Sequence, residues 1–155
     1  MSMMKIEVID RRTFLIGAGA SAATLAALSN LAHATPDQAA AFLAKLTGGA
    51  QPAEGKVKLV MPEIAENGAT VPTEVSADSP MTEKDYCKSI SIISTKNPKP
   101  HICTFHFTPR SGKAVAKIRV RMAETQEVWA VAQMSDGKWY IGKTTVKVTI
   151  GGCGG

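Results

Sequence analysis

Residues 126–150, with the sequence QEVWAVAQMSDGKWYIGKTTVKVTI, decide the fold class of this chain. Two runs rich in β-branched and aromatic residues lie on either side of Asp136-Gly137. An Asp-Gly pair between such runs is a strong signal for a β-hairpin with a two-residue turn. The segment therefore predicts two antiparallel strands, paired so that Met134 lies opposite Trp139.

The second strand of this hairpin does not fit a regular continuation of that register. Uninterrupted pairing would turn Lys143 toward the core and Val146 toward solvent, because successive side chains point to opposite faces. One inserted residue restores the parity, and glycine is a typical site for it. We therefore expect a β-bulge at Gly142 and Lys143.

The chain between residues 56 and 150 has the pattern of strands separated by Gly, Pro and Asn turns. The expected strands are 57–61, 70–76, 86–95, 102–108, 114–123, 127–134 and 138–150. Breaks every ~8–12 residues, without alternating helices, indicate an antiparallel sandwich rather than a parallel sheet. We predict an all-β fold in which residues 51–150 form the β-sandwich.

A short helix is expected before the sandwich, within residues 35–50. Thr35 can cap it, Pro36 suits its first turn, and Gln38 completes a capping box. Gly48-Gly49 ends it. A helix of this length is marginal alone, so it needs a surface to pack against.

The strand at 127–134 is apolar on both faces. One face carries Met134 with smaller apolar residues, and the other carries Trp129 and Val131. Two alternatives remain open for the second face. Either the N-terminal helix or a loop covers Trp129 and Val131, or these two residues form an interface with a partner protein.

Residues 1–34 have the pattern of a twin-arginine signal peptide. Arg11-Arg12 precedes an Ala-rich apolar stretch at 16–31, and residues 32–34 form a small-x-small cleavage site. The alternative is a retained membrane anchor, but a spanning helix needs about 20 residues of stronger hydrophobicity. We therefore expect export to the periplasm, with no membrane anchor after cleavage.

Charge and motif content exclude several classes of function. The chain has 18 Lys and Arg against 13 Asp and Glu, yet the basic residues are scattered and only 5% of residues are aromatic. A nucleic-acid-binding protein would show a basic cluster, often with stacking aromatics. Hydrolase, zinc-protease, phosphate-loop and dinucleotide fingerprints are also missing from the sequence. We expect no nucleic-acid partner, no catalytic residues and no cofactor.

Neither a metal site nor a disulfide is expected from the central histidines and cysteines. Strand alternation places His106 opposite to His101 and Cys103, which is poor geometry for a metal ion. A hairpin centred near Pro98 would separate Cys87 from Cys103 by ~20 Å along the strands. A disulfide needs Cα atoms within about 7 Å. Cys103 is therefore expected to be a buried small hydrophobe.

The chain ends in a glycine-rich tail directly after the last strand. The tail consists of Gly151, Gly152, Cys153, Gly154 and Gly155. Glycine gives the backbone its greatest freedom, so we predict a flexible arm, 151–155, that carries a covalently bound group on Cys153. The alternative is an idle, frayed terminus, but an exposed thiol is a liability in an oxidising compartment unless it is used. No basic side chain in the tail activates Cys153, so partner proteins would have to supply the activating groups.

The sequence resembles the SoxY family, the sulfur-carrier subunits of the bacterial sulfur-oxidation (Sox) system. The resemblance covers the chain after residue 34, and its ending is the most specific part. The motifs that carry it are 62–68 (PEIAENG), 79–82 (SPMT), 104–109 (TFHFTP), 134–137 (MSDG) and 146–155 (VKVTIGGCGG).

This resemblance implies an immunoglobulin-like sandwich that forms a heterodimer with SoxZ, a partner without an export signal. It also implies a reaction cycle on Cys153. A c-type cytochrome couples thiosulfate to the thiol oxidatively, a manganese-dependent hydrolase removes sulfate, and a sulfur dehydrogenase oxidises the remaining sulfane sulfur. The chain is then a substrate of its partner enzymes and not an enzyme, while Cys87 and Cys103 have no assigned role.

Two other functions remain open from the residues themselves. One is an exported interaction module whose tail cysteine only forms intermolecular disulfides. The other is a periplasmic copper or redox protein, which would show metal-dependent absorbance.

Overall fold

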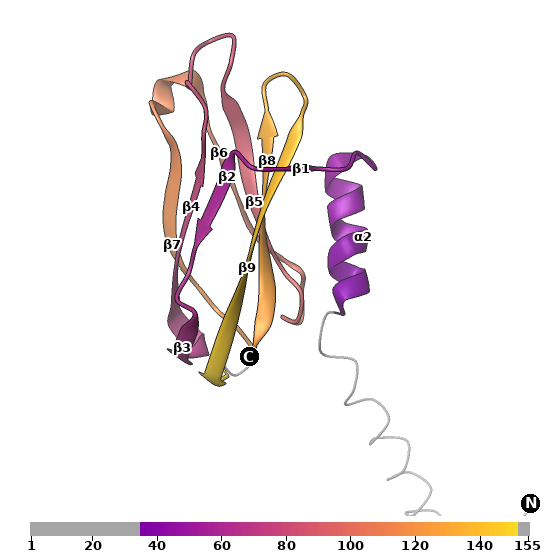
Figure 1. The fold of residues 1–155 in the computed structure, drawn as a ribbon, viewed down its shortest axis with the longest axis vertical. Coiled ribbons are helices and arrows are strands. Elements are labelled where there is room, and N and C mark those ends of the chain that lie inside the picture. Colours follow the sequence, from indigo (N-terminus) through magenta and orange to yellow (C-terminus); the bar gives the residue numbers. More distant parts are fainter. Residues whose placement is uncertain (1–34, 152–155) are drawn as a thin grey trace, which may run out of the picture. The chain divides into compact units, whose positions relative to one another are not determined.

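The computed structural model describes residues 35–151, which form two packed β-sheets with a helix on the outer face of the larger one (Figure 1). The larger sheet has the strand order β1-β9-β8-β5-β6, with β3 also paired to β9, and the smaller has the order β2-β4-β7. The elements are α2 (Pro36–Thr47), β1 (Ala53–Glu54), β2 (Val57–Val60), β3 (Ile64–Asn67), η1 (Gly68–Thr70), β4 (Val71–Ala77), β5 (Cys87–Ser94), β6 (His101–His106), η2 (Pro109–Ser111), β7 (Ala114–Val120), β8 (Gln126–Met134) and β9 (Trp139–Ile150). The all-β sandwich with a short N-terminal helix is confirmed.

Most strand pairs are antiparallel, as expected, but two short strands were not predicted. Both β1 and β3 pair with β9 in parallel, at opposite ends of that long strand. No helix in the described part of the chain is long and apolar enough to cross a membrane.

Helix α2 has the ends that the sequence predicts. The hydroxyl of Thr35 accepts a hydrogen bond from the backbone N–H of Gln38 at 3.4 Å, and Pro36 occupies the first turn. Gly48 ends the helix with a left-handed φ of +65°. Glycine adopts that conformation without the steric penalty of a side chain.

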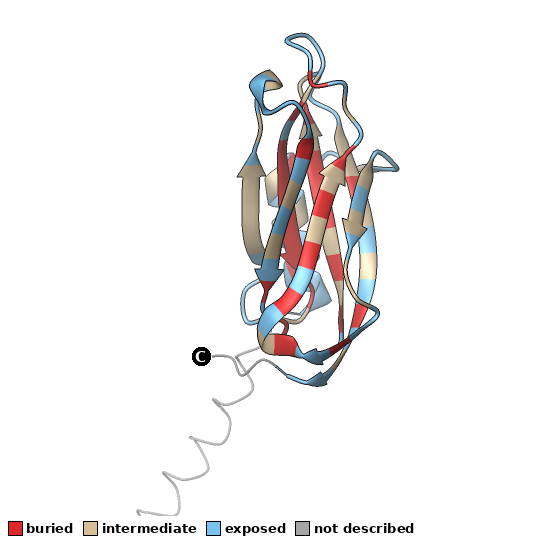
Figure 2. Cartoon of the chain, turned by 90° about the vertical axis from the view of Figure 1, so that its left-hand side faces the viewer, coloured by how far each residue is buried: buried red, intermediate tan, exposed pale blue. Residues whose placement is uncertain are grey.

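The main core lies between the two sheets. Along β4, buried residues alternate with more exposed ones (Figure 2), so one face of the smaller sheet points inward. Strand β7 follows the same rule, with Lys117 and Arg119 on its exposed face, as its alternating sequence predicts. The largest fully buried side chains of this core are Ile90, Ile92, Met122, Val71, Val75, Val128 and Val146.

A second core lies under α2, on the outer face of the larger sheet. Ala39 of the helix packs with Ile93, Val131 and Ile141, and all four are buried. Of the two alternatives for the outer face of β8, the structure therefore has the helix as the cover. Val131 is fully buried, so its assignment to a partner interface is wrong.

Trp129 differs from Val131 because its ring is only partly buried. Its indole N–H donates to the carboxylate of Glu127, and the Lys143 ammonium lies 5.4 Å from its ring centroid. A contact between Trp129 and a partner protein stays a prediction.

The predicted bulge at Gly142 and Lys143 is wrong. The β8–β9 register is regular, and it pairs Ala130 with Gly142. The parity is corrected in the turn instead, where the loop has three residues and Gly137 has a left-handed φ of +84°. Such a three-residue loop is the next most common hairpin connection after the two-residue one. Trp139 consequently pairs with Gln133 and not with Met134.

Candidate functional site

The predicted carrier arm begins where β9 ends. Gly151 is the last residue that the structure describes, and Gly152, Cys153, Gly154 and Gly155 lie outside the described residues. The structure therefore shows the root of the arm, formed by the end of β9 and the segments that hold it.

Two segments hold the end of β9, one on each side. Strand β3 pairs with it in parallel, and the Thr149 hydroxyl donates to the carbonyl of Glu66 at 3.0 Å. On the other side, the β8 ladder stops at Gln126, and the Thr125 side chain takes its place. The Thr125 hydroxyl accepts from the Val148 N–H at 2.9 Å. The last residues of β9 are therefore held by hydrogen bonds along both edges of the strand.

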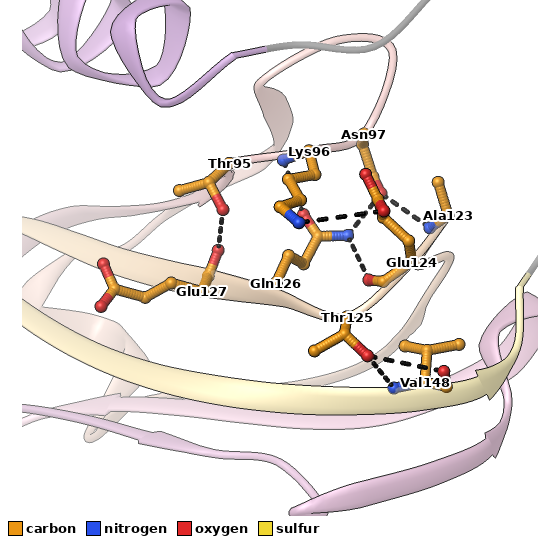
Figure 3. Close-up of polar contacts among 9 residues, drawn as sticks. All are labelled: Thr95, Lys96, Asn97, Ala123, Glu124, Thr125, Gln126, Glu127 and Val148. Atoms are coloured by element: carbon orange, nitrogen blue, oxygen red, sulfur yellow. Dashed lines mark hydrogen bonds and ion pairs between the residues drawn. The ribbon is translucent and has the colours of Figure 1, made fainter.

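Asn97 fixes the loop between β7 and β8, which runs beside the root (Figure 3). Its side-chain nitrogen donates to the Arg121 carbonyl at 2.7 Å, and its side-chain oxygen accepts from the Ala123 N–H at 3.0 Å. The same oxygen accepts from the Gln126 amide at 2.9 Å. Gln126 is only 2% exposed, and its oxygen accepts from the Lys96 N–H at 3.0 Å. One loop is therefore braced against another by two hydrogen-bonded side-chain amides, the buried one of Gln126 and the partly exposed one of Asn97.

Gly151 packs directly against this braced loop. A Cβ built on Gly151 would fall far inside van der Waals contact with the carbonyl oxygen of Ala123. No side chain fits at Gly151 unless backbone moves.

The surface around the root carries exposed apolar side chains. Ile64 in β3 is 58% exposed and Ile150 in β9 is 70% exposed. An open groove of about 680 Å³ lies on the smaller sheet and is lined in part by Val60, Met61, Pro62, Pro72, Lys117 and Arg119. Exposed apolar surface of this kind is typical of protein–protein contact.

Cys87 and Cys103 are both free, as predicted. Cys87 is buried in the main core, whereas Cys103, predicted to be buried, is only partly buried against that core. Burial raises the pKa of the Cys87 thiol to about 11, although a hydrogen bond to the Ser89 carbonyl opposes the shift. Burial also raises the pKa of Cys103. The thiolate is the reactive form of cysteine, so both side chains are held in their unreactive form at neutral pH.

His101 and Cys103 of β6 do not share a face of the sheet, although the sequence predicts that they would. A register shift between Ile92 and Ile93 pairs His101 with Ile93 and Cys103 with Ile92, so these two β6 side chains lie on opposite faces. His101 faces α2, where its ring stacks on Phe42 at 5.1 Å between centroids. Within residues 35–151, no three His, Cys, Asp or Glu side chains are grouped closely enough to hold a metal ion.

The fold and the root together define a single β-sandwich domain that leads into a cysteine-bearing, glycine-rich tail. Residues 43–153 match the family described as "Sulfur oxidation protein SoxY", and this match includes Cys153. The chain belongs to the SoxY family. Among curated protein sequences, none matches it.

One solved structure supports this family, and a second shares the fold. The sulfur carrier protein SoxY from Chlorobium limicola f. thiosulfatophilum is 34% identical, with a TM-score of 0.61, and the match covers 74% of this chain and 98% of that one. A superoxide reductase (neelaredoxin) from Ignicoccus hospitalis is 13% identical, with a TM-score of 0.55, and the match covers 61% of this chain and 80% of the reductase. At that identity the second likeness shows a shared fold alone. Family membership supports a sulfur-carrier role in sulfur oxidation.

Proposed function

We propose that this chain is a periplasmic sulfur carrier whose Cys153 thiol holds thiosulfate-derived intermediates covalently and presents them to partner enzymes. The observation that carries the proposal is the family match, which extends through the tail to Cys153. The 34% identical SoxY from Chlorobium is itself described as a sulfur carrier protein.

The state of the other two thiols supports the choice of Cys153. Cys87 is fully buried and its pKa is raised to about 11, while the pKa of the partly buried Cys103 is also raised. Neither supplies an accessible thiolate near neutral pH. Cys153 lies two positions after Gly151, in a tail that starts at the exposed end of β9.

The proposed cycle begins with loading. A sulfur–sulfur bond forms between Cys153 and the terminal sulfur of thiosulfate, the thiol proton is released, and a c-type cytochrome accepts two electrons. A manganese-dependent hydrolase then adds water to the adduct, which releases sulfate and two protons and leaves a persulfide anion on Cys153.

The remaining sulfane sulfur is oxidised on the same arm. A sulfur dehydrogenase removes six electrons and six protons while three water molecules supply oxygen, so the persulfide becomes an S-sulfonate. Hydrolysis of that group releases a second sulfate and regenerates the thiol. The chain acts throughout as a covalent substrate of its partners, and the cycle needs no catalytic residue or cofactor of its own.

A heterodimer with a SoxZ-like subunit is part of this proposal. The twin-arginine pattern at residues 1–34 supports it, because that route exports folded proteins and can carry a bound partner without a signal. Exposed apolar groups such as Ile64 and Ile150 offer contact surface for partner proteins near the root.

Intact-mass measurement tests the proposal directly. The chain and its SoxZ-like partner are incubated with thiosulfate, a thiosulfate-coupling cytochrome and an electron acceptor. We expect a mass increase of one thiosulfate group that disappears on reduction and is missing in Cys153→Ser. The matched variant Cys103→Ser should load normally. If wild-type protein shows only disulfide-linked dimers on non-reducing gels and no adduct, the chain is instead an interaction module with a disulfide-forming tail.

A further inference from the structure

Position 151 needs glycine because a side chain has no room there, and not because the backbone has a left-handed φ. Other glycines of the fold, such as Gly48 and Gly137, have left-handed φ values and open space where a Cβ would lie. Gly151 has no left-handed φ, yet its Cβ would collide with the Ala123 carbonyl oxygen. The colliding atom is backbone, so it cannot rotate away as a flexible side chain would. The first glycine of the tail is therefore exposed to solvent, yet its backbone lies close to the Ala123 carbonyl of the sandwich.

The Ala123 side of this contact is held in place by Asn97. The Asn97 amide bonds the Arg121 carbonyl and the Ala123 N–H at once, with distances of 2.7 and 3.0 Å. Gln126 braces Asn97 from the sheet (Figure 3), and it also donates to the Glu124 carbonyl at 3.2 Å. A further bond from the Met122 N–H to the Gly68 carbonyl, 2.7 Å long, ties the same loop to η1.

The Gly151 side of the contact is held along both edges of β9. Asn67 of β3 pairs with Ile150, the residue directly before Gly151. On the opposite edge, the Thr125 hydroxyl bonds the Val148 N–H. Because hydrogen bonds hold both partners, and Thr125 links the β7–β8 loop directly to β9, neither side can shift away from the other without breaking some of these bonds.

We infer that Gly151 is the fixed root of the carrier arm, and that Asn97 is a positioning residue that sets the direction in which the arm leaves the sandwich. With the root at Gly151, only Gly152 stands between the root and Cys153, so the Cα atoms of Gly151 and Cys153 are at most about 7 Å apart. A fixed root confines the thiol to a small volume at one end of the sandwich. That confinement raises its effective concentration at the active site of a docked enzyme. The inference rests on the proposed carrier function of Cys153.

Backbone ¹⁵N relaxation on the full chain tests the position of the root without any sulfur chemistry. We expect the Gly151 and Ala123 amides to have order parameters near the rigid value of about 0.85, and Gly152 and Gly155 to fall below about 0.6. In Asn97→Ala, the order parameter of Gly151 should fall toward that of Gly152. If Gly151 is as mobile as Gly155 in the wild type, or unaffected in Asn97→Ala, the inference is wrong.

Enzymatic loading tests the functional consequence with a matched pair of variants. Gly151→Ala and Gly154→Ala add the same methyl group on either side of Cys153. For loading by the thiosulfate-coupling cytochrome, we expect kcat/KM to fall at least tenfold in Gly151→Ala and clearly less in Gly154→Ala. Alkylation of Cys153 by iodoacetamide should be unchanged in both, because a small reagent needs no particular arm direction.

These outcomes distinguish the positioning role of the root from the carrier function of Cys153. Equal loading in the two variants, or slower alkylation in Gly151→Ala, would overturn the positioning role. A wild-type chain that is never loaded would instead refute the carrier function, while the relaxation data would still decide whether Gly151 is rigid.

Discussion

The backbone carbonyl oxygen of Val57 in β2 lies 2.6 Å from the place that a Cβ on Gly142 in β9 would occupy. The two residues belong to different sheets, so this close approach joins the two layers of the sandwich. Gly142 has no left-handed φ, and it pairs regularly with Ala130. Glycine is needed here for the close approach of two backbones and not for a bulge.

Replacing Gly142 with Ala should therefore destabilise the fold. The added methyl group meets backbone, and overpacking of this kind typically removes about 1–3 kcal/mol from the free energy of unfolding. Urea denaturation measures the loss. Thr145→Ala, at an exposed position of the same strand, should change stability by no more than about 0.5 kcal/mol. Equal stability of the two variants would mean that the sheets can separate slightly at no cost.

Strand β9 also shows what its sequence does and does not determine. The alternation of polar and apolar residues correctly required one extra residue between Ala132 and Val146. Both Gly137 and Gly142 were able to supply it, and the pattern alone does not distinguish them. In the structure Gly137 takes the left-handed conformation, whereas Gly142 lies in a regular strand and allows the close approach of the Val57 carbonyl.

The carrier tail was visible in the sequence, but its root was not. Asn97 stands next to Pro98, in the segment that the sequence predicts as a connection between the strands 86–95 and 102–108, yet its partners Ala123 and Gln126 are 26 and 29 positions away. Hydrogen bonds between loops leave no periodic signal. Strands β1 and β3 have only 2 and 4 residues, too few for an alternating pattern to be recognised. Gly151 likewise looks like any other glycine of the tail until its contact with Ala123 is seen.

The buried thiol of Cys87 should make the fold sensitive to alkaline pH. Its pKa rises from 9.0 to about 11 on burial, so the unfolded chain loses this proton at lower pH than the folded chain. The stabilisation is complete below pH 9 and is lost as the pH rises toward 11. Between pH 8 and 10, Cys87→Ala should lose about 1 kcal/mol less stability than the wild type.

Urea unfolding at both pH values, with a reductant present, measures this difference. Val128→Ala truncates another fully buried side chain that carries no titratable group. It should be less stable than the wild type by the same amount at each pH. A Cys87→Ala variant with the pH dependence of the wild type would show that Cys87 does not contribute.

Thiol labelling of the folded protein should be confined to one site. The raised pKa values of Cys87 and Cys103 make their thiolate fractions at pH 7 smaller than that of an exposed, unperturbed thiol, and only the thiolate reacts quickly. Iodoacetamide should therefore modify one thiol rapidly, and intact mass should show no rapid modification in Cys153→Ser. In urea all the cysteines should react. Rapid labelling of folded Cys153→Ser would contradict the protection of the buried Cys87 and the partly buried Cys103.

Docking of α2 can be tested at two adjacent alanines. Ala39 is fully buried against the larger sheet, whereas Ala40 is exposed. Ala39→Glu buries an unpaired carboxylate and should cost about 2 kcal/mol or more, or release the helix. Release would raise the accessibility of Trp129 and Trp139 to acrylamide, measured by fluorescence quenching. Ala40→Glu should be within about 0.5 kcal/mol of the wild type, and equal behaviour of the two variants would mean that α2 is not docked.

The last prediction concerns the slenderness of the arm beyond its root. Gly152 and Gly154 flank Cys153, and replacing both with Val adds bulk beside the thiol. The free energy of unfolding should change by less than about 0.5 kcal/mol, the usual range for surface positions. Thiosulfate-dependent turnover should nevertheless be lost, because reacting atoms must approach within ~3–3.5 Å and a narrow enzyme channel would exclude the branched side chains.

Melting temperature, binding to the SoxZ-like partner and turnover should be measured together in this double variant. Iodoacetamide provides the control: its reaction with Cys153 should persist, since a small reagent reaches the thiol without a channel. Normal turnover would refute the slender-arm mechanism. Loss of folding or of partner binding would show instead that the tail is part of the domain. We expect an intact heterodimer that is alkylated normally but can be neither loaded nor unloaded by the partner enzymes.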